Sequence, residues 1–259
     1  MTSVRLEPGP GGPAGGVRVL TLDEPGKRNA LSPGVVAGLT DAVRAVAEDA
    51  DARVLVVTGS GPAFCAGADL PATFGQVDRP VTEVRDRLLE VYESFLRIGR
   101  LPILTIAAVN GPAIGAGLNL AFCCDLRLAA PAATFGVTFT RLGLHPGGGC
   151  TSFLVRALGR QRALALILDG GTLTADEALE LGIVLRIETD PLAAAMELAE
   201  RHAHLPRALL GAIKRTVGLA TEADLGTVVE AESWAQAASV VTSPELRAAV
   251  ARHRDRNPG

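Results

Sequence analysis

The chain has 259 residues, a formal net charge of −3 and 48% hydrophobic residues. This length and composition predict one large α/β domain, or such a domain with an appended part, with enough apolar side chains for a full core. The small net charge and the scattered Lys and Arg residues argue against a nucleic-acid-binding face and against a basic patch for membrane surfaces. Because no charged leader and no apolar run of bilayer length occur, we expect a cytoplasmic protein.

The four cysteines at positions 65, 123, 124 and 150 have neither the spacing of a metal site nor that of a disulfide framework. We therefore expect no metal ion. The neighbouring pair at 123 and 124 lies in an apolar stretch and is expected to pack as small hydrophobic side chains.

The N-terminal part predicts a hairpin followed by a helix. Residues 4–7 and 17–22 alternate apolar and polar side chains on either side of a glycine-rich stretch, which predicts two paired strands with a long tip. Ser32 followed by Pro33 is typical of a helix start, with the serine as N-cap and proline in the first turn.

Two glycine-rich segments follow runs that read as buried strands, and we regard them as the centre of the chain. FCAGADL at 64–70 comes after the apolar run at 54–57, and NGPAIGAG at 110–117 comes after the run at 103–109. Small residues at a strand-to-helix junction let backbone N–H groups face a ligand. Two such junctions that face each other predict an oxyanion hole, whereas either one alone is also compatible with an ordinary turn.

The remaining elements follow from local patterns. After a looser segment at 71–80, apolar residues between 84 and 95 mark an amphipathic helix that stops before Leu101. The later patterns predict a short helix over 117–124, strands over 126–129 and 134–137, a helix over 151–158 and a strand over 183–187. Thr174 and Glu177 have the spacing of a capping box at the start of another helix.

From residue 192 onward the pattern is helical, with breaks before Pro206, at Thr221 and before Pro244. We therefore divide the chain into a strand-rich core at 1–195 and a helical part at 196–259.

Several motifs together resemble one known family. They are PGKRNAL at 25–31, AFCAGADL at 63–70, NGPAIGAG at 110–117, CDLRLA at 124–129, LGLHPGGG at 142–149 and SPE at 243–245. Their order and spacing resemble the enoyl-CoA hydratase/isomerase (crotonase) superfamily over nearly the whole chain. The resemblance implies an α/β fold, a spiral of strand–strand–helix turns. It also implies that the helices of 196–259 associate into a homotrimer or a dimer of trimers.

The resemblance also implies an acyl-CoA thioester as substrate or ligand, with no other cofactor. Carried over residue by residue, the thioester oxygen is held by the N–H groups of Ala68 and Ala116. The matching positions for the CoA nucleotide and for the rest of the ligand are Lys27, Arg28, Ala30, Ala66, Gly67, Asp69, Leu70, Gly115 and Gly117. For Lys27 and Arg28 an ordinary solvated turn is an equal alternative, and for Asp69 we favour a helix N-cap. Asp125 is expected to be a hydrogen-bonded structural carboxylate.

The sequence departs from the family at the two glutamates that hydratases use as acid and base. The corresponding positions, which also belong to the expected substrate site, are Asn119 and Phe139. Neither side chain transfers protons, and each lost acid or base lowers a rate by about 10²–10⁴-fold. The sequence thus predicts an acyl-CoA enzyme of the hydratase/isomerase type with weak hydration, or alternatively a non-catalytic fatty acyl-CoA-binding protein.

His145 is the expected replacement for the missing acid or base, because histidine titrates near neutral pH. The alternative is that His145 only packs against or caps the following glycine loop. Glu83, Asp86 and Glu90 are further candidates, although carboxylates at helical spacing are more often a solvated face.

Overall fold

The computed structural model describes residues 2–75 and 78–256, and the chain divides into two compact units, Met1–Leu205 and Pro206–Gly259. The boundary expected at 195 falls inside helix α7 (Pro191–Ala203), which lies in the first unit. Of the described helices, none is both long enough and apolar enough to span a bilayer.

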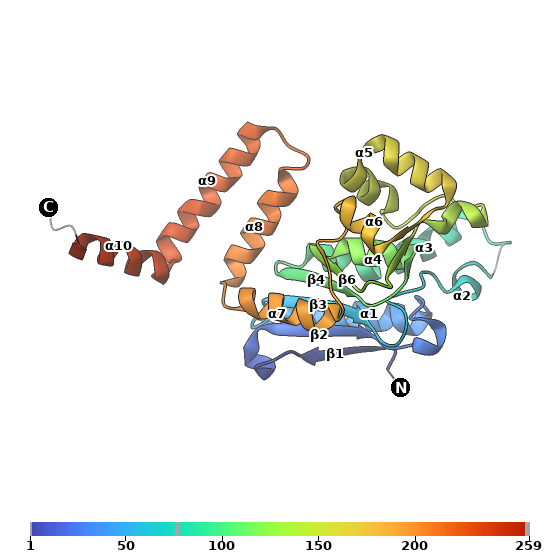
Figure 1. The fold of residues 1–259 in the computed structure, drawn as a ribbon, viewed down its shortest axis with the longest axis horizontal. Helices are drawn as coiled ribbons and strands as arrows, with labels where there is room; N and C mark the ends of the chain where they lie inside the picture. Colours follow the sequence, from blue (N-terminus) through green and yellow to red (C-terminus); the bar gives the residue numbers. More distant parts are fainter. Residues whose placement is uncertain (1, 76–77, 257–259) are drawn as a thin grey trace. The chain divides into compact units, whose positions relative to one another are not determined.

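The first unit is built on a six-stranded sheet with the strand order β1-β2-β3-β4-β6-β9 (Figure 1). These strands are β1 (Val4–Pro8), β2 (Val17–Leu22), β3 (Val54–Gly59), β4 (Leu104–Val109), β6 (Leu126–Ala129) and β9 (Arg186–Ile187). The β1–β2 pair is antiparallel, as the predicted hairpin requires, and every other pair in this sheet is parallel.

The central strands are buried on both faces, which explains their continuous apolar runs. On β3, Val54 and Val56 pack against α7, while Leu55 and Val57 face the opposite core. That larger core also contains side chains from α1, α3 and α4. The helices of the first unit are α1 (Pro33–Glu48), α2 (Leu70–Phe74), α3 (Val81–Arg100), α4 (Ala116–Cys123), α5 (Cys150–Asp169), α6 (Ala175–Glu180) and α7. Short 3₁₀ turns are η1 (Gly12–Gly15), η2 (Pro25–Lys27) and η3 (Thr138–Leu142).

Helix starts that the sequence predicts from capping residues are confirmed. The Ser32 side chain accepts a hydrogen bond from the Val35 N–H at the start of α1. At the start of α6, Thr174 and Glu177 form both bonds of the capping box. These starts depend on residues within one turn of each other, so local sequence suffices to identify them.

In the second half of the core, two predicted elements have other bounds and one strand was not predicted. The helix expected over 151–158 continues as α5 to Asp169, through a non-helical Gly159 with a φ of 74°. The strand expected over 183–187 is only Arg186–Ile187. A second, three-stranded sheet joins β5 (Ala113–Ile114), β7 (Thr134–Gly136) and β8 (Thr172–Thr174), and the sequence pattern does not reveal β8.

The second unit consists of α8 (Arg207–Leu219), α9 (Leu225–Thr242) and α10 (Pro244–Arg256), and its helix boundaries match the predicted breaks. Helices α8 and α9 pack against each other. Much of the apolar surface of this unit is exposed: Trp234 of α9 is 72% exposed and Leu225 is 78% exposed.

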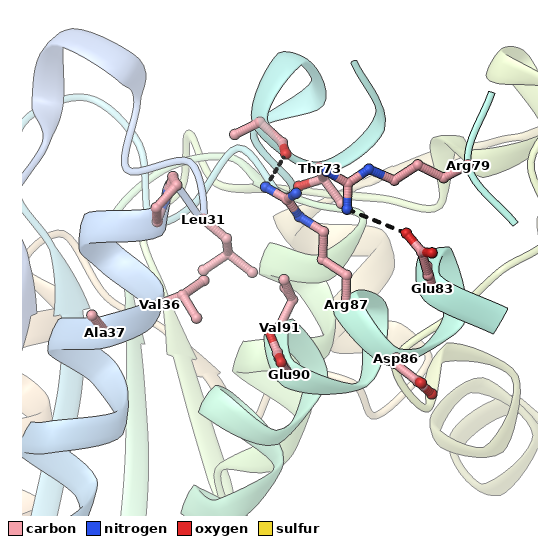
Figure 2. Close-up of a pocket in the computed structure, with 12 residues that line it drawn as sticks. Leu31, Val36, Ala37, Thr73, Arg79, Glu83, Asp86, Arg87, Glu90 and Val91 are labelled. Atoms are coloured by element: carbon pink, nitrogen blue, oxygen red, sulfur yellow. Dashed lines mark hydrogen bonds and ion pairs between the residues drawn. The ribbon is translucent and has the colours of Figure 1, made fainter. Parts of the chain in front are cut away.

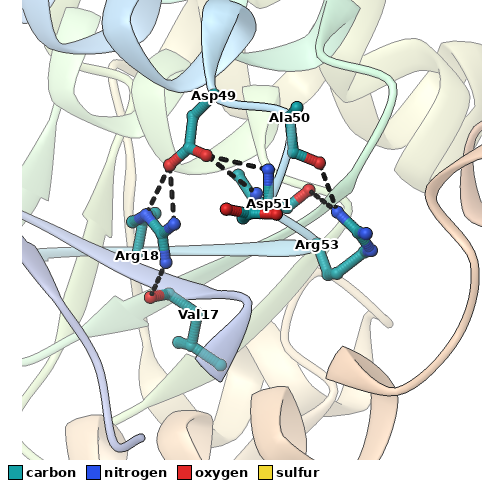
Figure 3. A network of polar contacts seen from close by, with 7 residues as sticks. Val17, Arg18, Asp49, Ala50, Asp51 and Arg53 are labelled. Atoms are coloured by element: carbon teal, nitrogen blue, oxygen red, sulfur yellow. Dashed lines mark hydrogen bonds and ion pairs between the residues drawn. The ribbon is translucent and has the colours of Figure 1, made fainter. Parts of the chain in front are cut away.

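An ion pair ties the beginning of β2 to the end of α1 (Figure 3). Arg18 Nε and Nη2 both lie 2.7 Å from Asp49 Oδ2, and Arg18 Nη1 donates to the Val17 carbonyl oxygen. The side chain of Arg18 is 8% exposed and that of Asp49 is 28% exposed. Burial raises the pKa of the Asp49 carboxyl, but hydrogen bonds from the Asp51 N–H and from Arg18 outweigh burial and lower it below its usual value.

Replacing Arg18 by Met should lower the free energy of unfolding by about 1–3 kcal/mol. The change breaks a mostly buried ion pair, but the Asp49 carboxylate remains partly exposed to solvent. Urea unfolding measures this loss. The matched control is Arg44→Met: Arg44 pairs with Asp41, both are exposed, and the expected change is below about 0.5 kcal/mol. Equal losses in both variants contradict the prediction.

The Arg18→Met effect should also depend on pH. A carboxyl whose pKa is lower in the folded state contributes stability above its unfolded pKa of about 3.9, and this contribution is lost as pH falls through the folded value. The difference between wild type and variant should therefore be constant from about pH 5 to 7 and shrink below about pH 4. A difference that does not change down to acid unfolding contradicts the assignment to Asp49.

Candidate functional site

The two glycine-rich segments lie side by side at the carboxyl ends of β3 and β4. The Cys65 N–H donates to the Pro112 carbonyl oxygen at 3.1 Å, and the Ile114 N–H donates to the Cys65 carbonyl oxygen at 3.0 Å. Cys65 and Ala113 thereby form an isolated parallel bridge. Backbone hydrogen bonds thus hold together two segments that are far apart in the sequence.

Two glycines make this close approach possible. An ideal Cβ on Gly117 would lie 2.1 Å from the Cys65 carbonyl oxygen. Gly67 has a φ of +93°, and a Cβ there would lie 2.5 Å from the Ile114 oxygen and 3.5 Å from the Ala116 nitrogen. Any side chain at either position would therefore separate the two segments.

The N–H groups of Ala68 and Ala116 point out of this backbone. The Gly67 carbonyl accepts from the Leu31 N–H at 2.7 Å, and the Gly115 carbonyl accepts from the Asn119 N–H at 3.2 Å. Because N–H and C=O are antiparallel in a trans peptide, the Ala68 and Ala116 N–H groups point away from those partners. Within the part of the chain that the structure describes, neither N–H donates to an acceptor. Ala116 is also the first residue of α4, where the helix dipole is positive.

The early motif packs against the first glycine-rich segment, so the expected CoA-binding positions are close together. The Ala66 N–H donates to the Arg28 carbonyl oxygen at 3.0 Å. Lys27 Nζ lies 3.3 Å from Asp69 Oδ2, and the lysine side chain is 61% exposed. Arg28 is also exposed, and Ala30 is half-buried.

Asp69 is the N-cap of α2, as we favoured from the sequence. Its Oδ1 accepts from the Ala72 N–H at 3.1 Å. This backbone hydrogen bond, together with Lys27, lowers the pKa of the Asp69 carboxyl despite partial burial. The adjacent Leu70 is exposed.

Asn29 is a key residue of this region that the sequence reading missed. It is fully buried, with a φ of 56°. Its Nδ2 donates to the carbonyl oxygens of Ser60 at 2.9 Å and Ala63 at 2.8 Å, and its Oδ1 accepts from the Glu24 N–H. Asn29 therefore anchors the early motif to the loop after β3. An asparagine within a turn was the available signal, because Asn tolerates a positive φ.

The two positions that depart from the family flank the start of α4. Asn119 is fully buried, and its Nδ2 donates to the Gly147 carbonyl oxygen at 2.8 Å. Its Oδ1 has no hydrogen-bond partner among the described residues. The half-buried Phe139 ring lies 3.7 Å from an ideal Cβ on Gly115. An amide and an aromatic ring thus border the turn that carries the Ala116 N–H.

His145 is exposed on the loop between η3 and α5. Its Nδ1 lies 2.7 Å from the carbonyl oxygen of its own neighbour, Pro146. This contact is local, as expected for a histidine that only organises the glycine loop. Among the described residues, His145 forms no hydrogen bond or ion pair with either glycine-rich segment.

The alternative carboxylates of α3 line a cavity of about 540 Å³ between α1, α2 and α3 (Figure 2). Glu83, Asp86 and Glu90 are exposed there, and Glu83 pairs with Arg79 at 3.7 Å. Arg87 donates to the Ala72 carbonyl oxygen of α2 at 2.6 Å. The three carboxylates therefore share one cavity with two arginines.

Across the described chain, no group of three or more His, Cys, Asp or Glu side chains has the arrangement of a metal site.

Asp125 is the structural carboxylate that the sequence predicts. Its Oδ2 accepts from both the N–H and the hydroxyl of Thr105, each at 2.8 Å. This pair of bonds joins the loop before β6 to the start of β4, and it leaves Asp125 with a structural role.

The four cysteines are buried and form no disulfide bond in the described structure. Burial raises the pKa of Cys65, next to the site, to about 12, and that of Cys150 also to about 12. Since the thiolate is the reactive form, we expect the native protein to react very slowly with an aromatic disulfide reagent at pH 8, and all four thiols to react after unfolding. Rapid reaction of Cys65 in the native state contradicts this expectation.

Comparison with known proteins identifies the family. The family model described as "Enoyl-CoA hydratase/isomerase" matches residues 13–248. The chain is 42% identical over 246 residues to the probable enoyl-CoA hydratase EchA14 of Mycobacterium tuberculosis, covering 92% of this chain and 94% of that protein. It is 36% identical over 220 residues to the 1,2-epoxyphenylacetyl-CoA isomerase of Escherichia coli, covering 84% of each.

A solved structure from Thermobifida fusca, described as a putative enoyl-CoA hydratase in complex with CoA, has a TM-score of 0.81 and 33% identity, with 93% of both chains covered. These matches confirm the resemblance seen in the motifs and the α/β fold that it implies. The chain therefore belongs to the enoyl-CoA hydratase/isomerase family, the crotonase superfamily.

Proposed function

We propose that this protein binds an acyl-CoA thioester with the thioester oxygen against the N–H groups of Ala68 and Ala116. The observation that carries the proposal is the pair of N–H groups that have no acceptor among the described residues. The CoA complex of the Thermobifida fusca relative supports the same ligand class. Lys27, Arg28, Ala30 and Ala66 are the proposed contacts for the CoA nucleotide.

The proposed chemistry is formation of a thioester enolate. A base removes the α-proton, the C–H electron pair moves toward the carbonyl, and negative charge collects on the thioester oxygen. Each well-placed N–H donor stabilises such a charge by roughly 2.7–4 kcal/mol.

Isomerisation is favoured over hydration, because the side chains of Asn119 and Phe139 do not activate water. His145 remains the proposed base, with Glu83, Asp86 and Glu90 as the alternatives.

A non-catalytic acyl-CoA-binding protein is the second candidate. It is favoured by the fully buried amide of Asn119 and by the absence of a carboxylate at that position. Both candidates require thioester binding, and only the first requires exchange of the α-proton.

Exchange of the α-protons in D₂O, followed by NMR on a panel of saturated and enoyl-CoA thioesters, distinguishes the two candidates. Exchange above background, lost in His145→Ala, supports the enzyme with His145 as base. Exchange that survives in His145→Ala moves the assignment to Glu83, Asp86 or Glu90. Binding by calorimetry without exchange supports the binding protein, and absence of binding contradicts both.

We further propose that the unit Pro206–Gly259 associates with other copies of the chain in a homotrimer or a dimer of trimers. The exposed apolar residues Leu225, Trp234 and Val241 support this proposal. Native mass spectrometry measures the assembly, and a monomer at micromolar concentration contradicts it.

A further inference from the structure

Residues 28 and 29, within the early motif at 25–31, form a strained turn. Arg28 has a φ of 52° and Asn29 a φ of 56°, and among the residues that the structure describes no other non-glycine residue has a positive φ. Asparagine tolerates this conformation, whereas for arginine it costs free energy and persists only where the surroundings impose it. Backbone strain of this kind gathers at binding sites.

The Asn29 side chain holds the turn in place. Its Nδ2 donates to the carbonyl oxygens of Ser60 at 2.9 Å and Ala63 at 2.8 Å, and its Oδ1 accepts from the Glu24 N–H at 3.0 Å. Both amide protons and the amide oxygen are therefore used. An ideal Cβ on Gly59 would lie 2.7 Å from Asn29 Nδ2, so the absence of a side chain at 59 leaves room for the amide.

Main-chain hydrogen bonds fix the backbone of Arg28 on two sides. Within the turn, the Arg28 N–H donates to the Pro25 carbonyl oxygen at 3.0 Å, and the Asn29 N–H donates to the Glu24 carbonyl oxygen at 3.0 Å. On the other side, the Arg28 carbonyl oxygen accepts from the Ala66 N–H of the first glycine-rich segment. The strained residue is thus held by its own motif and by the proposed site.

The side chain of Arg28 is the free charged group on this turn. Arg28 is exposed, and its guanidinium forms no hydrogen bond or ion pair with any described residue. The neighbouring Lys27, in contrast, pairs with Asp69. A guanidinium carries five N–H donors in a planar fork that matches a phosphate group. A fixed backbone below such a side chain lowers the entropy that is lost on binding.

We propose that Asn29 is a positioning residue for CoA: by holding Arg28 in the left-handed turn, it places the guanidinium against a phosphate group of the CoA nucleotide. The inference rests on the proposed function, which puts the nucleotide at the early motif. Asn29 is fully buried and has no surface with which to contact the ligand. It therefore acts on the affinity only through Arg28.

A double-mutant cycle, measured by calorimetry with butyryl-CoA, tests this dependence. Arg28→Gln removes the charge and should weaken binding about 10-fold, the effect of one lost hydrogen bond to a charged group. Asn29→Gly keeps the positive φ but lacks the three hydrogen bonds, and a similar loss is expected. The double variant should lose no more than either single variant, because one residue acts through the other. Losses that multiply to about 100-fold contradict the proposal.

Butyryl-pantetheine has the same thioester but no phosphate group, and it separates positioning from general damage. In an NMR titration its affinity should agree within about twofold between wild type and the three variants. If Asn29→Gly weakens both ligands equally, Asn29 has only a structural role and the inference is wrong. If butyryl-CoA does not bind wild type, the proposed function is wrong. If it binds wild type and Arg28→Gln equally, the inference is wrong and the proposed function stands.

Urea unfolding shows whether Asn29→Gly folds, and Gly61→Ala takes its place in the cycle if it does not. An ideal Cβ on Gly61 would lie 2.9 Å from Pro25 Cβ, so alanine there pushes on the same turn from outside. The matched control is Thr58→Val, which removes a buried hydrogen bond to the Ala108 carbonyl oxygen at 2.9 Å, outside the early motif. This variant should be less stable than wild type and bind both ligands with unchanged affinity. A loss of butyryl-CoA affinity in Thr58→Val equal to that in Asn29→Gly overturns the inference.

Discussion

Replacing Gly117 by alanine is expected to lower the free energy of unfolding by about 3 kcal/mol or more. The new Cβ would lie 2.1 Å from the Cys65 carbonyl oxygen and 2.8 Å from the Cys65 carbonyl carbon. These are backbone atoms, so no side-chain rotation relieves the overlap. Either α4 or the segment at 64–70 has to move, and the bridge between Cys65 and Ala113 weakens.

The same shift should reduce ligand binding and any turnover by about 100-fold, because displacement of a binding group by about 1 Å has an effect of that size. Urea unfolding and calorimetry with butyryl-CoA measure the two effects. The matched control is Gly218→Ala in α8, where a Cβ meets nothing within 4 Å. Alanine there should be neutral or stabilising by about 0.5–1 kcal/mol. A Gly117→Ala protein as stable as wild type contradicts the close packing of the two segments.

Replacing Ala116 by proline is expected to remove one of the two proposed donors while the fold is preserved. Ala116 is the first residue of α4, a position where helices tolerate proline because its N–H makes no intrahelical bond. We expect the rate of α-proton exchange to fall by about 10²–10³-fold. The midpoint of thermal unfolding should change little.

If the protein has no turnover, a binding assay tests the same donor. Wild type should bind an acyl-CoA thioester more tightly than the S-alkyl-CoA thioether, which lacks the carbonyl oxygen, and Ala116→Pro should lose this preference. Leu225→Pro is the matched control, because Leu225 is the first residue of α9. If Ala116→Pro folds normally and retains both the exchange rate and the preference, the Ala116 N–H is not a donor to the thioester.

The sequence by itself determined the features that depend on neighbouring residues. The N-cap at Ser32, the capping box at Thr174, and the breaks between α7, α8, α9 and α10 each depend on side chains within one helical turn. The motifs were sufficient to identify the family, and through the resemblance they led to Ala68 and Ala116 as the proposed donors to the thioester oxygen. Asp125 as a structural carboxylate followed from its place after an apolar helix.

Only the tertiary structure decided which distant groups meet. Strand β8 has three residues and exists through its pairing with β7, so a local pattern does not distinguish it from a loop. The hydrogen bonds of Asn29 reach Ser60 and Ala63, more than thirty positions away. Tyr92 and Asn119 both lie against Gly147, although the three residues come from different parts of the chain. No local sequence pattern predicts this contact. Such contacts depend on how the chain packs. A buried hydrogen-bond acceptor without a donor can be recognised only when the positions of all its possible partners are known.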